Sequence, residues 1–157
     1  MRLKIHFIVI VVIASIGCGK KQSLKTITVD EFSKFVDSTG YVTDAEKYGW
    51  SIVQKTIHHF EIVDSATWKY PNGIDPALPN MSVTQVSYND ALAYCKWTGT
   101  ALPSYEDYWK MTAQDSRKII MNAERIESPG NINIVGNTWD ITNTTNYKGE
   151  VRLAGGS

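Results

Sequence analysis

The chain has 157 residues, the usual length of a single domain. Hydrophobic residues make up 43% of it and charged residues 20%, and this balance excludes an intrinsically disordered protein. Lys and Arg together number 16, as do Asp and Glu, so no basic excess indicates a nucleic-acid partner. The two cysteines, Cys18 and Cys95, are too far apart for a zinc-binding spacing.

The first residues have the pattern of a secretion signal. Arg2 and Lys4 give a positive start, and residues 5–16 are apolar but too short to span a membrane as a mature helix. The run ends in "ASIGC", and a small residue directly before a cysteine resembles the cleavage site of bacterial lipoprotein signal peptides. In such proteins the chain is cleaved before the cysteine, which is then acylated.

We therefore expect residues 1–17 to be a signal peptide, Cys18 to carry the lipid, and residues 18–27 to form a short polar tether. This prediction places the protein in the bacterial cell envelope, bound to a membrane through acyl chains at Cys18, on the periplasmic or the outer side. Ser15 stands where such signals usually have Leu, so an anchor helix with an incidental cysteine stays the alternative.

Capping signals predict three helices. Thr28 followed by Glu31 forms a capping box, and Gly40 is a natural C-terminal stop. Between them, four apolar residues share one helical face: Val29, Phe32, Phe35 and Val36. Ser87 with Asp90 begins the second helix, which Gly99 ends. Ser104 with Asp107 begins the third, and residues 115–125 would form a further short helix.

The rest of the chain predicts short strands and irregular segments. Strands are expected near Ser51–Val53, Phe60–Val63 and Val83–Val86, and "YPNGIDP" is a dense turn signal. Residues 41–80 would otherwise be a long loop packed by its own aromatic residues, and such loops are often functional. The fold class is therefore α+β, with little regular secondary structure.

Three stretches, taken in order, resemble the formylglycine-generating enzyme family, also called sulfatase-modifying factor domains. The first is "EFSKFVDSTGYVTDAEKYGWS", residues 31–51. The second, within residues 71–109, contains "VTQVSYNDALAYCKWTGTALPSYEDYW" and is similar to the family's "HVSW-DA-AYC-WAG-RLPTEAEWE". The third is "NIVGNTWDIT" followed by "VRLAGGS", similar to "VGNVWEWT" and "R-LRGGS". The resemblance implies a C-type-lectin-like domain over residues 28–157, incomplete at both ends.

The resemblance implies a structural calcium site in "NIVGNTWDIT". Asn133 and Asp140 would give side-chain oxygens, and Gly136 and Thr138 would give backbone carbonyls. Calcium prefers six to eight hard oxygen ligands, which a curved loop of this composition can supply. Asp140 stands where the family prefers Glu. The alternative is an ordinary Asn/Gly turn before a strand, with Asp140 exposed.

The resemblance also implies copper chemistry. In the family, two cysteines bind Cu(I), and molecular oxygen oxidises a substrate cysteine to formylglycine. Soft thiolates suit Cu(I), but the matching cysteines would follow Ser157 and are not in this sequence. Copper is expected only if they exist. Trp139 and Ser157 match active-site positions of the family, and Cys95 is expected to be a small core residue.

The sequence departs from the family's pattern elsewhere. Gln85 stands where the family usually has His, and Ala101 replaces the Arg before "LP". His58 and His59 would point to opposite faces of a strand, so we do not expect them to share one metal ion. The paired acids in two places are expected to be solvated: Asp44 with Glu46, and Glu106 with Asp107.

Three hypotheses follow. The first is a non-catalytic envelope lipoprotein that uses the fold to bind a protein or glycan ligand. The second is a truncated copper- and oxygen-dependent formylglycine-generating oxidase that acts on a protein cysteine. The third is a fragment that does not fold alone, which a cooperative thermal melt would exclude. Nothing in the sequence resembles a catalytic triad or a nucleotide-binding loop.

Overall fold

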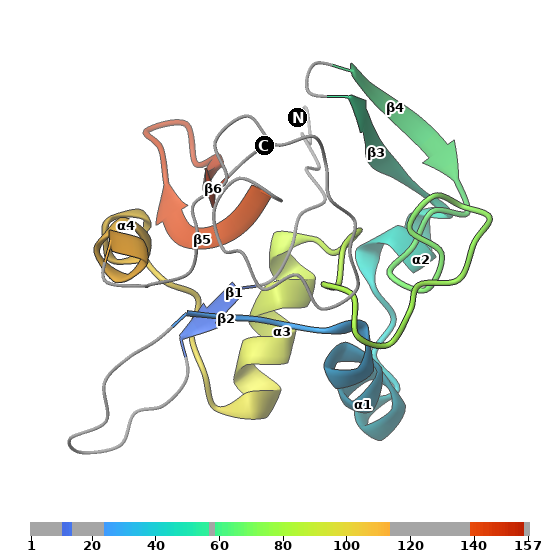
Figure 1. Cartoon of the computed structure of the whole chain (residues 1–157), viewed down its shortest axis with the longest axis horizontal. Helices are drawn as coiled ribbons and strands as arrows, with labels where there is room; N and C mark the ends of the chain where they lie inside the picture. The colour runs from blue at the N-terminus through green and yellow to red at the C-terminus, as the bar shows by residue number, and fades with distance from the viewer. Residues whose placement is uncertain (1–10, 14–23, 57–58, 114–138, 156–157) are drawn as a thin grey trace.

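The computed structural model describes residues 11–13, 24–56, 59–113 and 139–155 (Figure 1). These residues form short strands and helices in the following order: β1 Val11–Ile13, β2 Leu24–Thr26, α1 Val29–Thr39, α2 Asp44–Tyr48, β3 Trp50–Thr56, β4 His59–Asp64, α3 Tyr88–Thr98, α4 Tyr105–Ala113, β5 Trp139–Thr145 and β6 Val151–Gly155. Pairs of strands alternate with pairs of helices along the chain, and the paired strands are antiparallel, so the predicted α+β class is confirmed.

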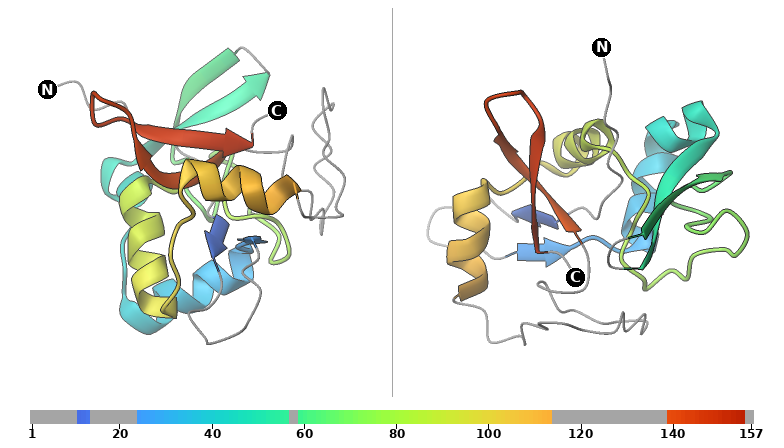
Figure 2. Two further views of the ribbon diagram at one scale, coloured as in Figure 1. Left: turned by 90° about the vertical axis from the view of Figure 1, so that its left-hand side faces the viewer. Right: turned by 90° about the horizontal axis from the view of Figure 1, so that it is seen from above.

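The strands described pair into three separate antiparallel ribbons: β1 with β2, β3 with β4, and β5 with β6. The β3–β4 hairpin lies at one side of the molecule beside α2, and the β5–β6 hairpin lies at the other beside α4 (Figures 1 and 2). Two-stranded ribbons are barely stable alone, so each depends on the helices and loops packed against it.

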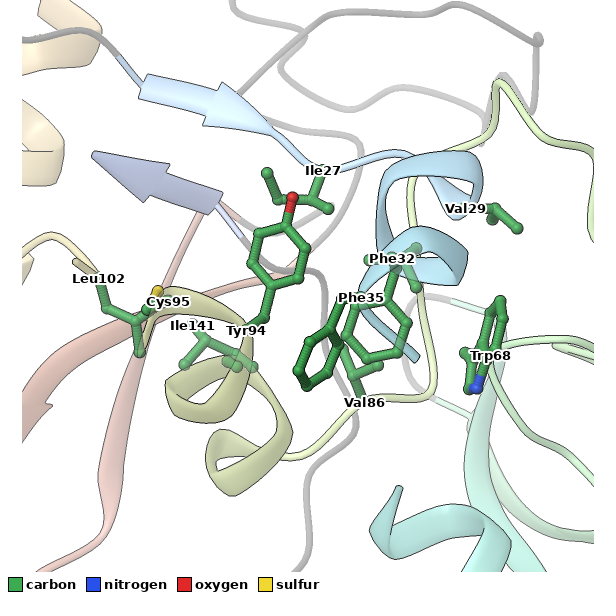
Figure 3. Close-up of a cluster of buried hydrophobic side chains, with 12 residues drawn as sticks. Ile27, Val29, Phe32, Phe35, Trp68, Val86, Tyr94, Cys95, Leu102 and Ile141 are labelled. Atoms are coloured by element: carbon green, nitrogen blue, oxygen red, sulfur yellow. The ribbon is translucent and has the colours of Figure 1, made fainter. Parts of the chain in front are cut away.

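The core is built mainly from aromatic and branched side chains of α1 and α3 (Figure 3). Phe32 is fully buried at its centre. Its ring lies edge-on to Phe35 and Trp68, with centroids 5.4 and 5.3 Å away, and stacks on Tyr94 at 5.8 Å. Because Trp68 comes from the long segment after β4, this cluster fastens that segment to the two helices.

Local signals explain where α1 and α3 begin and end. The Thr28 hydroxyl accepts from the Glu31 backbone N–H, while the Glu31 carboxylate accepts from the Thr28 N–H, which completes the predicted capping box. Gly40 follows α1 with φ 66°, a left-handed conformation that glycine adopts without strain. Ser87 and Gly99 bound α3 in the same manner, as predicted.

The predicted tether is partly wrong. Residues 24–27 belong to the fold, because Leu24 and Ile27 are buried and β2 pairs with Val11–Ile13. Cleavage before Cys18 would remove β1, and the signal-peptide boundary itself stays a prediction. None of the helices in the described part of the chain is long and apolar enough to cross a membrane.

The segment from residue 41 to residue 80 has more regular structure than predicted. The two expected strands are present and longer, as β3 and β4. The unpredicted helix α2 has its own capping box, in which Thr43 and Glu46 bond each other's backbone N–H. The sequence signal was therefore present, but five residues are too short for a hydrophobic periodicity to reveal the helix.

The strand predicted at Val83–Val86 does not form. Val83 donates its N–H to the Ile27 carbonyl at 2.9 Å, and the neighbouring Ser82 makes one isolated bridge to Thr28. Gln85 then takes φ 58°, a left-handed conformation that interrupts an extended strand. The helix predicted at residues 115–125 lies outside the described residues.

Candidate functional site

Only part of the predicted calcium loop lies in the described structure. Asn133, Gly136 and Thr138 fall outside the described residues, as do Ser157 and Cys18. Trp139 and Asp140 open β5, where they pair with Gly155 and Ala154 of β6. Trp139 is 38% exposed and Asp140 is 1% exposed, so the two side chains point to opposite faces of the ribbon.

The buried Asp140 carboxylate is held from the neighbouring helix. The Tyr108 hydroxyl donates to Asp140 Oδ2 at 2.6 Å, and both side chains are buried. Burial, together with the adjacent Asp140 charge, raises the pKa of the Tyr108 phenol far above its ordinary value, so it keeps its proton and remains a donor. The alternative of an exposed Asp140 in a plain turn is wrong.

Asp140 has the chemistry that a hard cation requires. Its carboxylate lies at the first buried position of β5, where the predicted loop ends, and calcium binds carboxylate oxygens. Asp140 therefore fits as one oxygen ligand. Within the described residues, no three His, Cys, Asp or Glu side chains cluster as a metal site.

A bulge in β5 joins this hairpin to α4. The register shifts between Ile141 and Thr145, and the Thr144 hydroxyl accepts from the Tyr105 N–H at 2.9 Å. The Arg152 guanidinium lies 3.7 Å from the centroid of the Tyr105 ring. Such bulges redirect side chains, and this one ties the start of α4 to both strands of the hairpin.

Cys95 is a core residue, as predicted. It is 4% exposed and lies beside Leu102 and Ile141 (Figure 3). Burial raises the pKa of the Cys95 thiol, against the opposing effect of a hydrogen bond with the Thr100 side chain. The thiol is therefore kept protonated, which is the opposite of what a metal-binding or nucleophilic cysteine requires.

A buried carboxylate network, which the sequence did not predict, joins α2 to α3. Asp90 is fully buried and accepts from the Ser87 N–H at 2.7 Å, the Tyr41 hydroxyl at 3.0 Å and the Asp44 N–H at 3.1 Å. Burial, with the nearby Asp44 charge, raises the pKa of Asp90 against the effect of these hydrogen bonds. The sequence predicted that Asp90 caps α3, but not that Tyr41 and Asp44 donate to its carboxylate.

The prediction that Asp44 and Glu46 are solvated is wrong. The Ser87 hydroxyl donates to Asp44 Oδ2 at 2.6 Å, and Asn89 donates to the same oxygen at 3.2 Å. Although burial acts to raise it, the pKa of Asp44 lies below its ordinary value because Ser87, Asn89 and Lys47 all donate to the carboxylate. Glu46 is held in the α2 capping box.

Two further predicted positions have structural partners. Ser51 of β3 donates to Gln85 Oε1 at 2.6 Å, and both residues are buried, so the side chain that replaces the family's usual His fixes the hairpin to the core. His59 contacts the Glu61 carboxylate at 2.7 Å, and His58 lies outside the described residues. Ser104 caps α4, because its hydroxyl accepts from the Asp107 N–H at 3.0 Å, and the same hydroxyl donates to the Asp107 carboxylate at 2.7 Å.

Comparison with known proteins identifies this arrangement. Residues 23–148 match the sulfatase-modifying factor enzyme 1-like domain family. A formylglycine-generating enzyme of Thermomonospora curvata is 39% identical over 106 residues, which cover 54% of this chain and 33% of that protein. The formylglycine-generating enzyme of Bos taurus is 32% identical over 137 residues, which cover 73% of this chain and 36% of that protein.

A third relative, named inactive C-alpha-formylglycine-generating enzyme 2, from Mus musculus, is 32% identical over 110 residues, or 59% of this chain and 35% of that protein. The chain thus spans about a third of the length of these relatives. The family match covers most of the described fold, including the capped helices α1, α3 and α4. The chain belongs to the sulfatase-modifying factor enzyme 1-like domain family.

Proposed function

We propose that this protein is an envelope lipoprotein whose sulfatase-modifying-factor domain binds a protein or glycan ligand without catalysing its oxidation. The observation that supports the non-catalytic part of the proposal is the environment of Cys95, which lies in the most family-like stretch of the sequence and is the one cysteine among the described residues. Its thiol is buried, its pKa is raised, and its neighbours are core side chains. One relative is named an inactive formylglycine-generating enzyme, so related domains also occur without that activity.

The described residues do not fit a copper site. Cu(I) prefers two or more soft thiolate or thioether ligands, and a thiol held protonated in the core offers none. Cys95 therefore packs rather than coordinates, and no step of a copper reaction is assigned to it. It lies in the same buried cluster as Leu102 and Ile141 (Figure 3).

The second candidate function is a copper- and oxygen-dependent oxidase that converts a protein cysteine to formylglycine. Relatives up to 39% identical are named formylglycine-generating enzymes, and this favours the candidate. The copper-binding cysteines would have to come from residues outside this sequence. In that case the domain described here would be the scaffold that positions them.

One experiment separates the two functions. The protein is purified as its gene encodes it, with any residues that follow Ser157, and is supplied with Cu(I) and oxygen. It is then incubated with a synthetic cysteine-containing peptide, whose mass is followed for conversion of the thiol to an aldehyde. The binding-module proposal predicts an unchanged peptide, while a known formylglycine-generating enzyme converts it in parallel. Catalytic turnover by the purified chain would overturn the proposal in favour of the oxidase.

We also propose that calcium braces the entry to β5, with Asn133, Gly136, Thr138 and Asp140 as ligands. The buried Asp140 carboxylate supports this ligand set, because calcium would neutralise a charge that is costly to bury. Asp140→Asn should abolish a calcium-dependent rise in melting temperature. Tyr108→Phe, the matched control, keeps the carboxylate and should retain that rise. A parent protein that shows no calcium effect would refute the site.

Lipidation at Cys18 is the third part of the proposal, and it follows from the "ASIGC" pattern alone. Expression with a clickable fatty acid should label the wild-type protein and place it in the membrane fraction. Cys18→Ser should lose both the label and the membrane association. A label that persists in Cys18→Ser would contradict the anchor.

A further inference from the structure

The β3–β4 hairpin has one face packed on the molecule and one face turned away from it. In β3, Ser51 and Val53 are buried, and their cross-strand partners are Val63 and Glu61. Because side chains alternate along a strand, the outer face carries Ile52 together with two residues of β4, Phe60 and Ile62. Below, these three residues are called the β4 patch.

The hairpin is firmly held from its inner side. The buried hydrogen bond from Ser51 to Gln85 fastens β3 to the core. At the base, Gly73 approaches so closely that an added Cβ would lie 2.6 Å from the Asp64 carbonyl and 3.0 Å from the Val63 side chain. A residue larger than glycine could not make this approach, so Gly73 packs closely against the end of β4.

The β4 patch brings exposed apolar side chains together on one face of the hairpin. Phe60 is 53% exposed and Ile62 is 68% exposed, and Ile52 lies directly opposite Ile62 across the ribbon. In the described part of the chain, β4 pairs with β3 alone, so its second edge would offer backbone N–H and C=O groups to another strand. Native proteins usually protect such edges with a charge, a proline or a covering segment.

The size of the β4 patch decides between the partners that could cover it. Two exposed apolar side chains and a half-buried third offer roughly 300 Å² of apolar area, since a whole aromatic residue buries about 150–250 Å². A stable interface between folded proteins needs about 800 Å² from each partner. A second copy of this chain would fall well short of that area, whereas a single added strand gains backbone hydrogen bonds from the edge as well.

The charges on β4 also constrain the partner. On the face opposite the β4 patch, His59 Nε2 and a Glu61 carboxylate oxygen lie 2.7 Å apart, so these two polar side chains already contact each other. We propose that the outer edge of β4 binds an extended peptide segment as a third strand, with β-branched or aromatic side chains of the peptide against Phe60 and Ile62. The proposal rests on the binding-module function, and it specifies the ligand of that function as an extended peptide.

The test uses the full chain and a fluorescein-labelled peptide of alternating valine and threonine, followed by fluorescence anisotropy. Wild-type protein should bind it, and Ile62→Asp should weaken binding at least tenfold. Ile74→Asp is the matched control, because Ile74 is 80% exposed but lies outside the β4 patch, and it should bind like wild type. If Ile62→Asp lowers the melting temperature, Phe60→Ser replaces it as the test variant.

Three results would overturn the proposal. These are no binding of the peptide by wild-type protein, equal binding by Ile62→Asp, or a concentration-dependent dimer in light scattering that Ile62→Asp abolishes, which would assign the patch to a second copy. Binding is measured directly, so failure here leaves the outcome of the cysteine-peptide oxidation assay unaffected.

Discussion

Two buried carboxylates, Asp90 and Asp140, accept hydrogen bonds from segments that are far away in the sequence. Asp140 takes a hydrogen bond from Tyr108 and ties β5 to α4. Asp90 takes three, from its own helix and from the segment that leads into α2. A buried carboxylate persists only where donors satisfy it, so each of these residues marks a place where distant segments must meet correctly.

Removing the Tyr108 hydroxyl should destabilise the protein without enlarging its core. Tyr108→Phe leaves the Asp140 carboxylate buried with one donor fewer, and the expected cost is about 1–3 kcal/mol in the free energy of unfolding. Urea titration in calcium-free buffer measures it. The exposed Tyr147→Phe is the control and should change nothing. A Tyr108→Phe protein as stable as wild type would show that this hydrogen bond is unimportant.

The pH dependence of stability should reveal Asp90. Its pKa in the folded protein is raised above the ordinary 3.8, so the folded state binds this proton more tightly than the unfolded state. The stability contributed by the protonated carboxyl is therefore complete below pH 3.8 and is lost as pH rises through the raised pKa. The free energy of unfolding of the wild type minus that of Asp90→Asn, measured by urea unfolding at a series of pH values from below 3.8 upward, should fall as pH rises. A difference that rises with pH would contradict the assignment.

At the scale of elements, each helix is set by its ends. α1, α2 and α3 all begin with a complete capping box, formed by Thr28, Thr43 and Ser87 with an acidic residue three positions later. These signals are local, which is why α1, α3 and α4 could be predicted from the sequence with nearly correct bounds. Helix α2 was missed because it is short. The strand predicted at Val83–Val86 does not form: Gln85 is left-handed and accepts a hydrogen bond from Ser51, which lies far away in the sequence.

Loss of the α1 cap should have a measurable and pH-dependent cost. Thr28→Ala removes the hydroxyl that accepts from Glu31 N–H and should cost about 1 kcal/mol, whereas Ser33→Ala on the exposed face should cost little. Although burial acts to raise it, contacts with Lys25 and Thr28 hold the pKa of Glu31 below 4.5. The stability contributed by the Glu31 carboxylate is present above pH 4.5 and is lost as pH falls through the lowered pKa. Thr28→Ala keeps the Thr28 N–H and removes only the part of this contribution that comes from the hydroxyl. A pH-independent effect would contradict it.

At the scale of the whole molecule, one aromatic core joins segments that are far apart in the sequence. The Phe32 ring contacts one ring from each of three segments: Phe35 of α1, Tyr94 of α3 and Trp68 of the segment after β4. The sequence identified Phe32 as a buried helix position, but not Trp68 as its partner, because such contacts depend on how the loops cross. The same limit applies to Tyr108 with Asp140, whose pairing across 32 residues no local pattern contains.

Truncating the centre of this core should nearly unfold the protein. Phe32→Ala is expected to cost about 3–5 kcal/mol, a large share of the stability of a small domain. Val42→Ala, at a half-exposed position, is the control and should cost far less. Thermal melts followed by circular dichroism compare the two. Similar melting temperatures for both variants would mean that the Phe32 cluster does not organise the fold.

The binding-module proposal requires that Cys95 packs in the core and does not bind copper. Cu(I) titration of the full-length Cys18→Ser protein against a chelator of known affinity tests this directly. We predict no stoichiometric Cu(I) binding while the protein is folded, because the thiol is buried and its pKa is raised. One equivalent of Cu(I) bound by the folded protein, and lost in Cys95→Ala, would contradict the account.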